Sequence, residues 1–332
     1  MNEVGTTVND TDGSKLTAWD SHWGKTTNTA AFEENTPLQD YLQAHWSDFL
    51  SRAITPHCAT KLIDLACGKG ILSELALAQG KVASARSFDI HCVDTSFNAV
   101  RDVAERLGIT TAFQADCASL PYQPNSFDIA VSQFGIEYAP IHAAKEFARV
   151  LKCSGKFAAV IHYKNGAIYE DCYEKQQLFE NVLSLNLFEK SLDAFTAGYA
   201  VIEGRIPIEA FHKADADFAP VIEQYKQLIV STNSPSKSLL VQILNDIGFM
   251  YENIESHSED EVKAWLTSTE LEFNNFKDRM SSMVNAAMDE EQVGQLLAPF
   301  LAKGFSQIIC ERLSVKDDPP FSWFVQISNV GA

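Results

Sequence analysis

The stretch Lys61-Leu-Ile-Asp-Leu-Ala-Cys-Gly-Lys-Gly70 decides the fold of this chain. Its first half alternates apolar residues around an aspartate, as a buried strand does, and its second half is a small turn with two glycines. The next segment, Ile71–Gln79, has helical spacing and stops at Gly80, a residue type that favours a helix C-terminus. A strand, a tight turn and a helix form the first unit of an open α/β sheet. Glycines let the backbone approach a ligand and a helix start favours an anion, so this turn predicts a site for a nucleotide-like cofactor.

The charge balance argues against two classes of partner. The chain has 332 residues with 44 acidic and 26 basic side chains, for a formal net charge of -18. Such a surface repels phosphate backbones and anionic lipid, and the basic residues are scattered along the sequence, so we expect no nucleic-acid partner. No apolar run approaches the roughly 18 residues that a membrane span needs, so we expect no span either.

The cysteines and the N-terminus bear on the compartment. Seven cysteines are spread widely without a CxxC pair, and the polar N-terminus lacks the basic-then-apolar order of a signal peptide. We therefore expect a reduced, cytoplasmic protein without a metal site, either monomeric or homodimeric.

Strand and helix patterns alternate after the first unit, which predicts an α/β fold with a parallel sheet and right-handed crossovers. The alternation then stops, and a long helical stretch precedes two final strand patterns joined by an Asp-Asp-Pro-Pro turn. The expected strands cover 85–94, 109–116, 127–133, 155–162, 305–313 and 321–327, and the expected helices of the later part cover 168–188, 219–230, 239–251, 260–283 and 290–302.

These patterns divide the chain into three parts. Residues 1–55 form an N-terminal helical segment in which 1–14 are expected to be disordered and 37–53 helical. Residues 56–164 and 288–332 form the core, and residues 165–287 form a helical insertion between the fifth and sixth strands of the sheet.

Polar side chains follow the strands at their carboxyl ends, where open α/β sheets bind ligands. A carboxylate in this position, Asp94, can accept hydrogen bonds from both hydroxyls of a ribose. Asp116 and Cys117 follow the third strand, and the segment from Gln133 to Tyr138 follows the fourth. One edge of the sheet thus offers groups for a ribose, an adenine and an amino-acid tail.

With these residues in place, the run from Lys61 to Tyr163 resembles the class I S-adenosylmethionine-dependent methyltransferases, in particular the group that includes the ubiquinone and menaquinone C-methyltransferases. The resemblance covers about a third of the chain. Its matching pieces are Leu62–Gly70, Cys92–Asp94, Ala115–Pro121, Asn125–Val131 and Ala148–Lys152.

The resemblance implies a Rossmann-like sheet of seven strands, mostly parallel with the last strand antiparallel, with helices on both faces. It also implies S-adenosylmethionine as the cofactor and S-adenosylhomocysteine as the product. Ala66 replaces the first glycine of the family's turn, a small residue that should still fit. The implied cofactor residues are Asp64, Ala66, Gly68 and Gly70 for the methionine portion, Asp94 with Thr95 for the ribose, Asp116 and Cys117 for the adenine, and Gln133 and Phe134 near the methyl group.

The catalytic residues are harder to read, because methyl transfer asks mainly for in-line placement of the acceptor and needs a base only where the acceptor loses a proton. His162 ends the fifth strand facing the expected site, and Glu137 and Tyr138 follow the fourth; these three are the catalytic candidates, with core packing as the alternative for His162. His22, between Trp19 and Trp23, is expected either to close over the cofactor or to pack on the surface.

Three functions remain open at this point. The first is a methyltransferase acting on a small, at least partly apolar organic acceptor chosen by the insertion. The second is a catalytically idle cofactor-binding protein that uses the helical region as an interaction surface. The third, a nicotinamide-dependent oxidoreductase, is disfavoured because Ser73 stands where GxGxxG needs its third glycine.

Overall fold

The computed structural model describes residues 11–26, 36–84, 87–316 and 318–329, and it divides the chain into two compact units. The first unit comprises Met1–Glu170 and Ser282–Ala332, and the second comprises Asp171–Ser281. The second unit is therefore an insertion into the sequence of the first. None of the described helices is long and apolar enough to cross a membrane.

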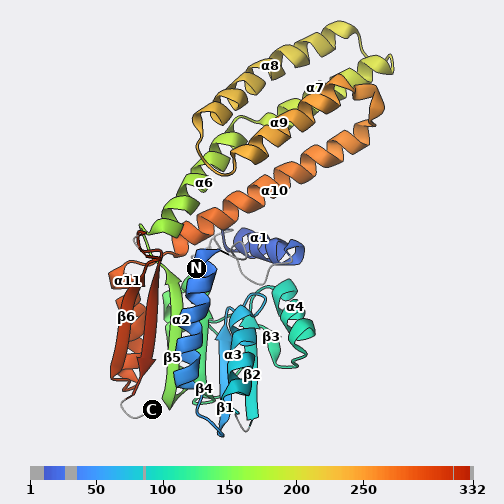
Figure 1. Ribbon diagram of the computed structural model, residues 1–332. Coiled ribbons are helices and arrows are strands. Elements are labelled where there is room, and N and C mark those ends of the chain that lie inside the picture. The colour runs from blue at the N-terminus through green and yellow to red at the C-terminus, as the bar shows by residue number, and fades with distance from the viewer. Residues whose placement is uncertain (1–10, 27–35, 85–86, 317, 330–332) are drawn as a thin grey trace, which may run out of the picture. The chain divides into compact units, whose positions relative to one another are not determined.

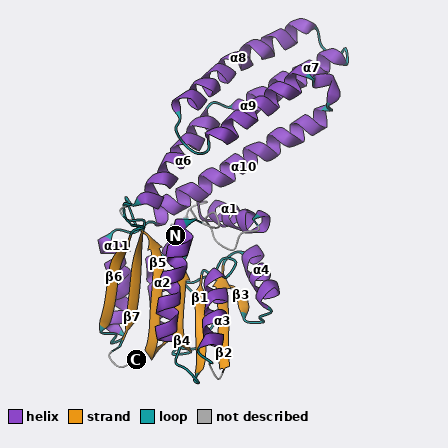
Figure 2. Ribbon diagram, viewed as in Figure 1, coloured by secondary structure: helices purple, strands orange, loops and turns teal. Residues whose placement is uncertain are grey.

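The first unit is built on a seven-stranded sheet with the strand order β3-β2-β1-β4-β5-β7-β6. Strands β1 to β5 pair in parallel, and β7 is antiparallel to both of its neighbours, β5 and β6. The predicted Rossmann-like sheet with its antiparallel last strand is confirmed (Figure 2). The strands are β1 Ala59–Leu65, β2 Ser87–Asp94, β3 Ala112–Gln114, β4 Phe127–Gln133, β5 Leu151–His162, β6 Gln307–Leu313 and β7 Ser322–Ser328.

Helices cover both faces of this sheet. On one face Ile63 and Leu65 of β1 share a core with Phe147 of α5 (Ala144–Val150) and Phe300 of α11 (Glu290–Ala302). On the other face lie α2 (Pro37–Ala53) and α3 (Ile71–Val82), as Figure 2 shows, and Trp46 of α2 contacts a β7 phenylalanine. Two further helices, α1 (Thr11–Lys25) and α4 (Phe97–Leu107), pack against each other. Two 3-10 turns, η1 (Ile136–Tyr138) and η2 (Ile141–Ala143), connect β4 to α5.

Local sequence signals set several of these boundaries. The Thr36 hydroxyl accepts a hydrogen bond from the Gln39 N–H, and a proline in the first turn fixes the start of α2. Asp289 and Gln292 form a reciprocal capping box at the start of α11. Side-chain caps of this kind are the reason that these two helices begin where the sequence predicted.

The second unit is helical and has its own hydrophobic core (Figure 1). Its largest fully buried side chains include Phe179, Phe195 and Tyr225, and the last of these donates its hydroxyl to the Leu240 carbonyl at 3.1 Å. The helices are α6 Ala167–Ser184, α7 Leu187–Ile202, α8 Ile208–Ser231, α9 Lys237–Glu252 and α10 Glu259–Ala286, with the 3-10 turn η3 Ile254–Ser256, and α6 and α10 begin and end, respectively, in the first unit.

Four predicted boundaries were wrong. The helix expected over 219–230 begins already at Ile208. The helix expected over 168–188 is two helices, because Asn186 adopts a left-handed conformation with φ of 55° and starts α7. The strand expected over 109–116 pairs only over Ala112–Gln114. The strand expected to begin at residue 155 begins at Leu151, directly after α5. Of the segment predicted to be disordered, residues 1–10 lie outside the described residues, and α1 already begins at Thr11.

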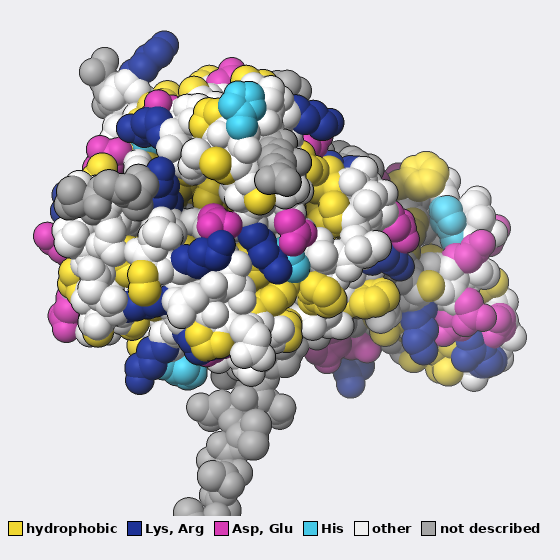
Figure 3. Space-filling view, turned by 90° about the horizontal axis from the view of Figure 1, so that it is seen from below, with side chains coloured by type: hydrophobic (Ala, Val, Ile, Leu, Met, Phe, Trp, Pro, Cys, Tyr) yellow, Lys and Arg dark blue, Asp and Glu magenta, His cyan; other side chains and the backbone are white. Residues whose placement is uncertain are grey.

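The surface carries mixed charge. On the face that Figure 3 shows, basic and acidic side chains are interspersed with apolar ones rather than gathered by sign. Among the described side chains on that face, no basic stripe of the kind that tracks a phosphate backbone is seen.

Candidate functional site

The turn after β1 has the backbone shape that its glycines suggested. Ala66, Gly68 and Gly70 all adopt left-handed conformations, with φ of 52°, 50° and 76°. A Cβ added at Gly70 would lie 2.3 Å from Val103 Cγ2, so α4 packs directly against the turn. A larger residue at this position would force the turn or α4 to move.

Asp64 joins the strand to the helix that follows it. Its Oδ2 accepts hydrogen bonds from the Ser73 N–H at 3.1 Å and from the Ser73 hydroxyl at 2.7 Å. Burial raises the pKa of Asp64 to about 7, against these hydrogen bonds, which lower it. Ser73 stands where a dinucleotide-binding motif has its third glycine. Its two hydrogen bonds to Asp64 fix the N-terminal turn of α3 to β1.

Asp94 joins the ends of β1 and β2. Its Oδ2 accepts from the Gly68 N–H at 2.8 Å and its Oδ1 accepts from the Ser96 N–H at 2.8 Å. Burial is the main cause that raises the pKa of Asp94. Each carboxylate oxygen has a second lone pair, so Asp94 can still accept a hydrogen bond on each side. Its neighbour Thr95 is exposed.

Helix α1 covers this turn. A Cβ added at Gly68 would lie 2.9 Å from the Trp23 ring, which stacks on Trp19 with 6.0 Å between ring centroids. His22 lies between them in the sequence, with its ring 5.0 Å from that of Trp23. Asp20 anchors α1, because its Oδ1 accepts from the Ser96 hydroxyl at 2.6 Å. In the structure α1 packs against both this turn and α4.

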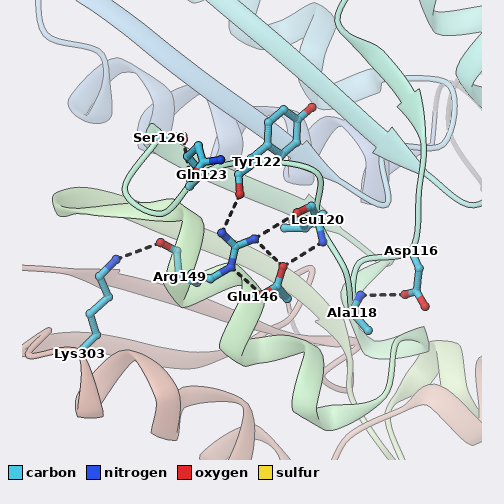
Figure 4. A network of polar contacts seen from close by, with 9 residues as sticks. All are labelled: Asp116, Ala118, Leu120, Tyr122, Gln123, Ser126, Glu146, Arg149 and Lys303. Atoms are coloured by element: carbon cyan, nitrogen blue, oxygen red, sulfur yellow. Dashed lines mark hydrogen bonds and ion pairs between the residues drawn. The ribbon is translucent and has the colours of Figure 1, made fainter.

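The loop after β3 is held in place by a polar network (Figure 4). Arg149 donates to the carbonyls of Leu120 and Tyr122 at 3.1 and 2.6 Å, and Glu146 accepts from the Leu120 N–H. Glu146 also pairs with Arg149, and the guanidinium holds the pKa of this carboxyl below its usual range.

The two residues predicted to contact adenine open that loop. Asp116 is exposed, and its Oδ1 accepts from the Ala118 N–H at 2.7 Å. Cys117 is buried, and burial raises the pKa of its thiol to about 12. The thiol is therefore neutral at ordinary pH and contributes an apolar wall.

The end of β4 lies beside the turn after β1. A Cβ added at Gly135 would lie 2.6 Å from Ala66 Cβ, so the two segments touch. Gln133 accepts a hydrogen bond from Trp46 Nε1 at 2.6 Å, and both residues line a cavity of about 300 Å³ between α2 and α3. Phe134 adopts a left-handed conformation with φ of 51°.

The three catalytic candidates lie together at the end of β5. Glu137 Oε1 lies 2.6 Å from His162 Nδ1 and also accepts the His162 backbone N–H at 3.0 Å. The Tyr138 ring centroid is 5.9 Å from that of His162, and the Phe134 ring centroid is 4.4 Å from it. Among the described residues, no group of three or more His, Cys, Asp or Glu side chains is arranged to hold a metal ion.

Some contacts of the site were not predicted from the sequence. Asp20 and Trp46 reach partners 76 and 87 residues away, Ser96 and Gln133. Trp46 lies on a helix whose apolar spacing was visible, but spacing alone does not say which distant strand end a helix meets. The backbone of Met288, at the far end of the helical insertion, accepts from the Trp323 Nε1 and donates to the His162 carbonyl.

The sheet order, the turn after β1 and the carboxylate after β2 together define a class. Residues 63–159 match the model of the methyltransferase domain family. This segment is a class I S-adenosylmethionine-dependent methyltransferase domain, and S-adenosylmethionine is the cofactor of that class.

Two curated relatives resemble the same part of the chain. The ubiquinone/menaquinone biosynthesis C-methyltransferase of Rhizobium rhizogenes is 33% identical over 121 residues, which are 35% of this chain and 47% of that protein. The protein of the same name from Rhizobium leguminosarum bv. trifolii is 34% identical over 117 residues, 33% of this chain and 45% of that protein. The chain thus spans about half the length of these relatives.

Solved structures add little to this assignment. An S-adenosylmethionine-dependent methyltransferase of Mesorhizobium loti has 20% identity and a TM-score of 0.29, and the match covers 35% of this chain and 53% of that one.

Proposed function

We propose that this protein is an S-adenosylmethionine-dependent methyltransferase that acts on a small, at least partly apolar organic acceptor. The observation that carries the proposal is the bridge made by Asp94, a buried carboxylate that joins the Gly68 N–H of the first turn to the Ser96 N–H of the second. Each carboxylate oxygen of Asp94 can accept one more hydrogen bond, and Asp94 lies at the edge of the sheet where such folds bind nucleotides.

The residues around this bridge fit the parts of the cofactor. The turn from Ala66 to Gly70 has no side chain larger than a methyl at its three left-handed positions, and it leads into the positive end of α3, which suits a carboxylate. Asp94 and Thr95 would receive the ribose, and Asp116 and Cys117 the adenine. Asp64 would support the methionine portion from below, with Gln133 and Phe134 near the methyl group.

When bound, the cofactor supplies a methyl group made electrophilic by a positively charged sulfur. The protein's part is to hold the acceptor in line and to keep water out. Aromatic rings suit this task beside a cation, and Trp19, Trp23 and Phe134 all lie around the first and fourth strand ends.

The helical unit is our candidate for acceptor choice, because the two curated matches cover only about a third of the chain and the family model ends at residue 159. Its core is apolar, and we propose that it contributes to selecting an acceptor with apolar character.

The test is incubation of the full chain with methyl-labelled S-adenosylmethionine and a metabolite extract, followed by identification of the labelled product. We expect one labelled small molecule that is absent with the Asp94→Ala variant. Tight binding of S-adenosylhomocysteine without any labelled product would favour the idle cofactor-binding protein instead.

A further inference from the structure

One histidine and one glutamate form a buried pair at the carboxyl end of β5. The side chains of His162 and Glu137 are 2% and 0% exposed. Glu137 Oε1 already accepts the His162 backbone N–H, and it lies 2.6 Å from Nδ1, so the ring nitrogen is the donor in that contact. The pair therefore places the imidazole proton on Nδ1 and leaves the lone pair on Nε2.

Three buried polar atoms at this place have no hydrogen-bond partner among the described residues. They are His162 Nε2, Glu137 Oε2 and the hydroxyl oxygen of Ser322, the residue that faces His162 across the β5–β7 pairing. A buried polar group without a partner destabilises the folded state, and directly opposed residues of a strand pair lie on one face of the sheet. Such a concentration at the strand ends points to a site that receives a polar group.

A second histidine of the same sheet shows the ordinary structural arrangement. His91, in the middle of β2, has Nε2 3.1 Å from Asp89 Oδ2 and Nδ1 3.3 Å from the Tyr122 hydroxyl. Both of its ring nitrogens are paired, and it lies away from the strand ends. His162 differs in having one nitrogen fixed by a carboxylate and the other unpaired.

Aromatic rings lie around the His162 ring. Phe134 lies 4.4 Å from the His162 ring and Tyr138 lies 5.9 Å from it in an edge-on arrangement, with Trp19 5.6 Å beyond Tyr138. Rings in these positions favour a flat, unsaturated acceptor held by its faces and edges.

We propose that His162 is a catalytic base and Glu137 its positioning residue, and that the acceptor is a phenol or enol whose weakly acidic hydroxyl is methylated. This inference rests on the proposed function. As the hydroxyl oxygen forms its bond to the methyl carbon, the carbon–sulfur electron pair stays on sulfur and the O–H proton passes to His162 Nε2. One positive charge leaves the sulfur and one appears on the imidazole, beside the Glu137 carboxylate, so the net charge of the site is unchanged.

The chemistry of the proton favours a hydroxyl over acceptors that have no proton to lose or ionise more readily. A tertiary amine or thioether has no proton to lose, and a thiol, with a pKa near 8.5, already supplies a few per cent of the reactive thiolate at neutral pH. A phenol, with a pKa near 10, is mostly protonated at neutral pH yet within reach of a neutral imidazole. A base with a fixed tautomer is useful for that acceptor and superfluous for the others.

The first test needs no acceptor. In the full chain saturated with S-adenosylhomocysteine and labelled with ¹⁵N-histidine, we expect nuclear magnetic resonance to show His162 with its proton on Nδ1 at pH 7.5. Glu137→Ala should reduce that tautomer, whereas Asp89→Ala should move the His91 signals and leave those of His162 in place. A wild-type His162 that carries its proton on Nε2, or on both nitrogens from pH 6.5 to 8.5, would overturn the proposal.

The second test uses the labelled product. We expect His162→Ala to lower the rate of methyl transfer about 100-fold or more, as loss of a general base does, with partial recovery in added imidazole. Glu137→Gln should keep the Nδ1 tautomer yet lower the rate at least about 10-fold, because the imidazolium loses its counter-charge. Both variants should bind S-adenosylhomocysteine within twofold of the wild type.

The outcomes separate the two proposals. Full transfer activity in His162→Ala, or a label found on nitrogen, sulfur or carbon, overturns the hydroxyl proposal and leaves the methyltransferase standing. Failure of the wild type to bind S-adenosylhomocysteine overturns the proposed function itself.

Discussion

The carboxyl end of the sheet and the helical unit differ in what they bury. The sheet end buries ionisable side chains, including Asp64, Asp94, Glu137 and His162, each held by hydrogen bonds to the backbone or to a neighbour. Within residues 171–281, all of which the structure describes, Ser191 is the only fully buried polar side chain other than tyrosine, and its hydroxyl bonds to the Leu187 carbonyl.

This contrast separates chemistry from packing. Burying a charge is costly unless it is compensated, so a fold keeps such groups where they serve a site. The helical unit consists of aromatic and aliphatic contacts, such as Phe179 with Phe273 at 4.9 Å and Phe195 with Tyr251 at 5.5 Å. Substitutions at the sheet end should therefore change cofactor affinity and pH response, and those in the core of the helical unit should change stability without changing cofactor affinity.

The largest expected effect is on the pH dependence of stability through Asp64. Its folded pKa of about 7 exceeds the unfolded value near 3.9, so between these values the folded state holds a proton that the unfolded state has released. Stability thus falls as pH rises through this window and levels off above about pH 7. At about 1.4 kcal/mol per unit, the step from pH 5 to 7 removes about 3 kcal/mol.

Urea unfolding at pH 5 and pH 8 measures this effect. The Asp64→Asn variant cannot ionise at this position, so its free energy of unfolding should not show this loss. From pH 5 to pH 8, the wild type should lose about 3 kcal/mol more unfolding free energy than the variant does. Parallel pH curves for the two proteins would show that Asp64 ionises normally in the folded state.

Next in size is the effect of Asp94 on cofactor affinity. Asp94→Ala removes the carboxylate that we expect to accept two hydrogen bonds from the ribose hydroxyls. At about 1.5 kcal/mol for each bond, affinity for the cofactor should fall roughly 100-fold. Calorimetric titration with S-adenosylhomocysteine measures it. Asp89→Ala is the matched control on the same strand, and its affinity should stay within twofold. Equal losses in both variants would mean that the map of the site is wrong.

The smallest effect is expected in the helical unit. Tyr225→Phe removes the hydrogen bond from the buried hydroxyl to the Leu240 carbonyl and leaves the ring in place. We expect a loss of about 1 kcal/mol in unfolding free energy and no change in affinity for S-adenosylhomocysteine. A tenfold loss of affinity in this variant would break the separation between the two regions.

The sequence predicted those elements whose ends are marked locally. The strand over 127–133 and the helix over 290–302 have the predicted bounds, the second because Asp289 forms a capping box. Helix α7 was missed, because the left-handed break at Asn186 lies inside a continuous helical pattern. Asparagine can adopt a helical or a left-handed conformation, so Asn186 alone does not mark a helix break.

The site divides in the same way. Candidates from motifs, such as Asp94 and His162, lie at the strand ends where the sequence placed them, because a parallel sheet gathers those ends at one edge. The pairing of His162 with Glu137, and that of Gln133 with Trp46, depends on side-chain directions set by tertiary packing. These contacts join segments 25 and 87 residues apart, and no local pattern encodes them.

We propose that the turn after β1 and the carboxylate after β2 hold the methyl donor. Equilibrium titration of the full chain with S-adenosylhomocysteine and, separately, with NAD tests it most directly. We expect saturable one-site binding of S-adenosylhomocysteine, at least about 100-fold tighter than any binding of NAD. Preferential binding of NAD would contradict the account.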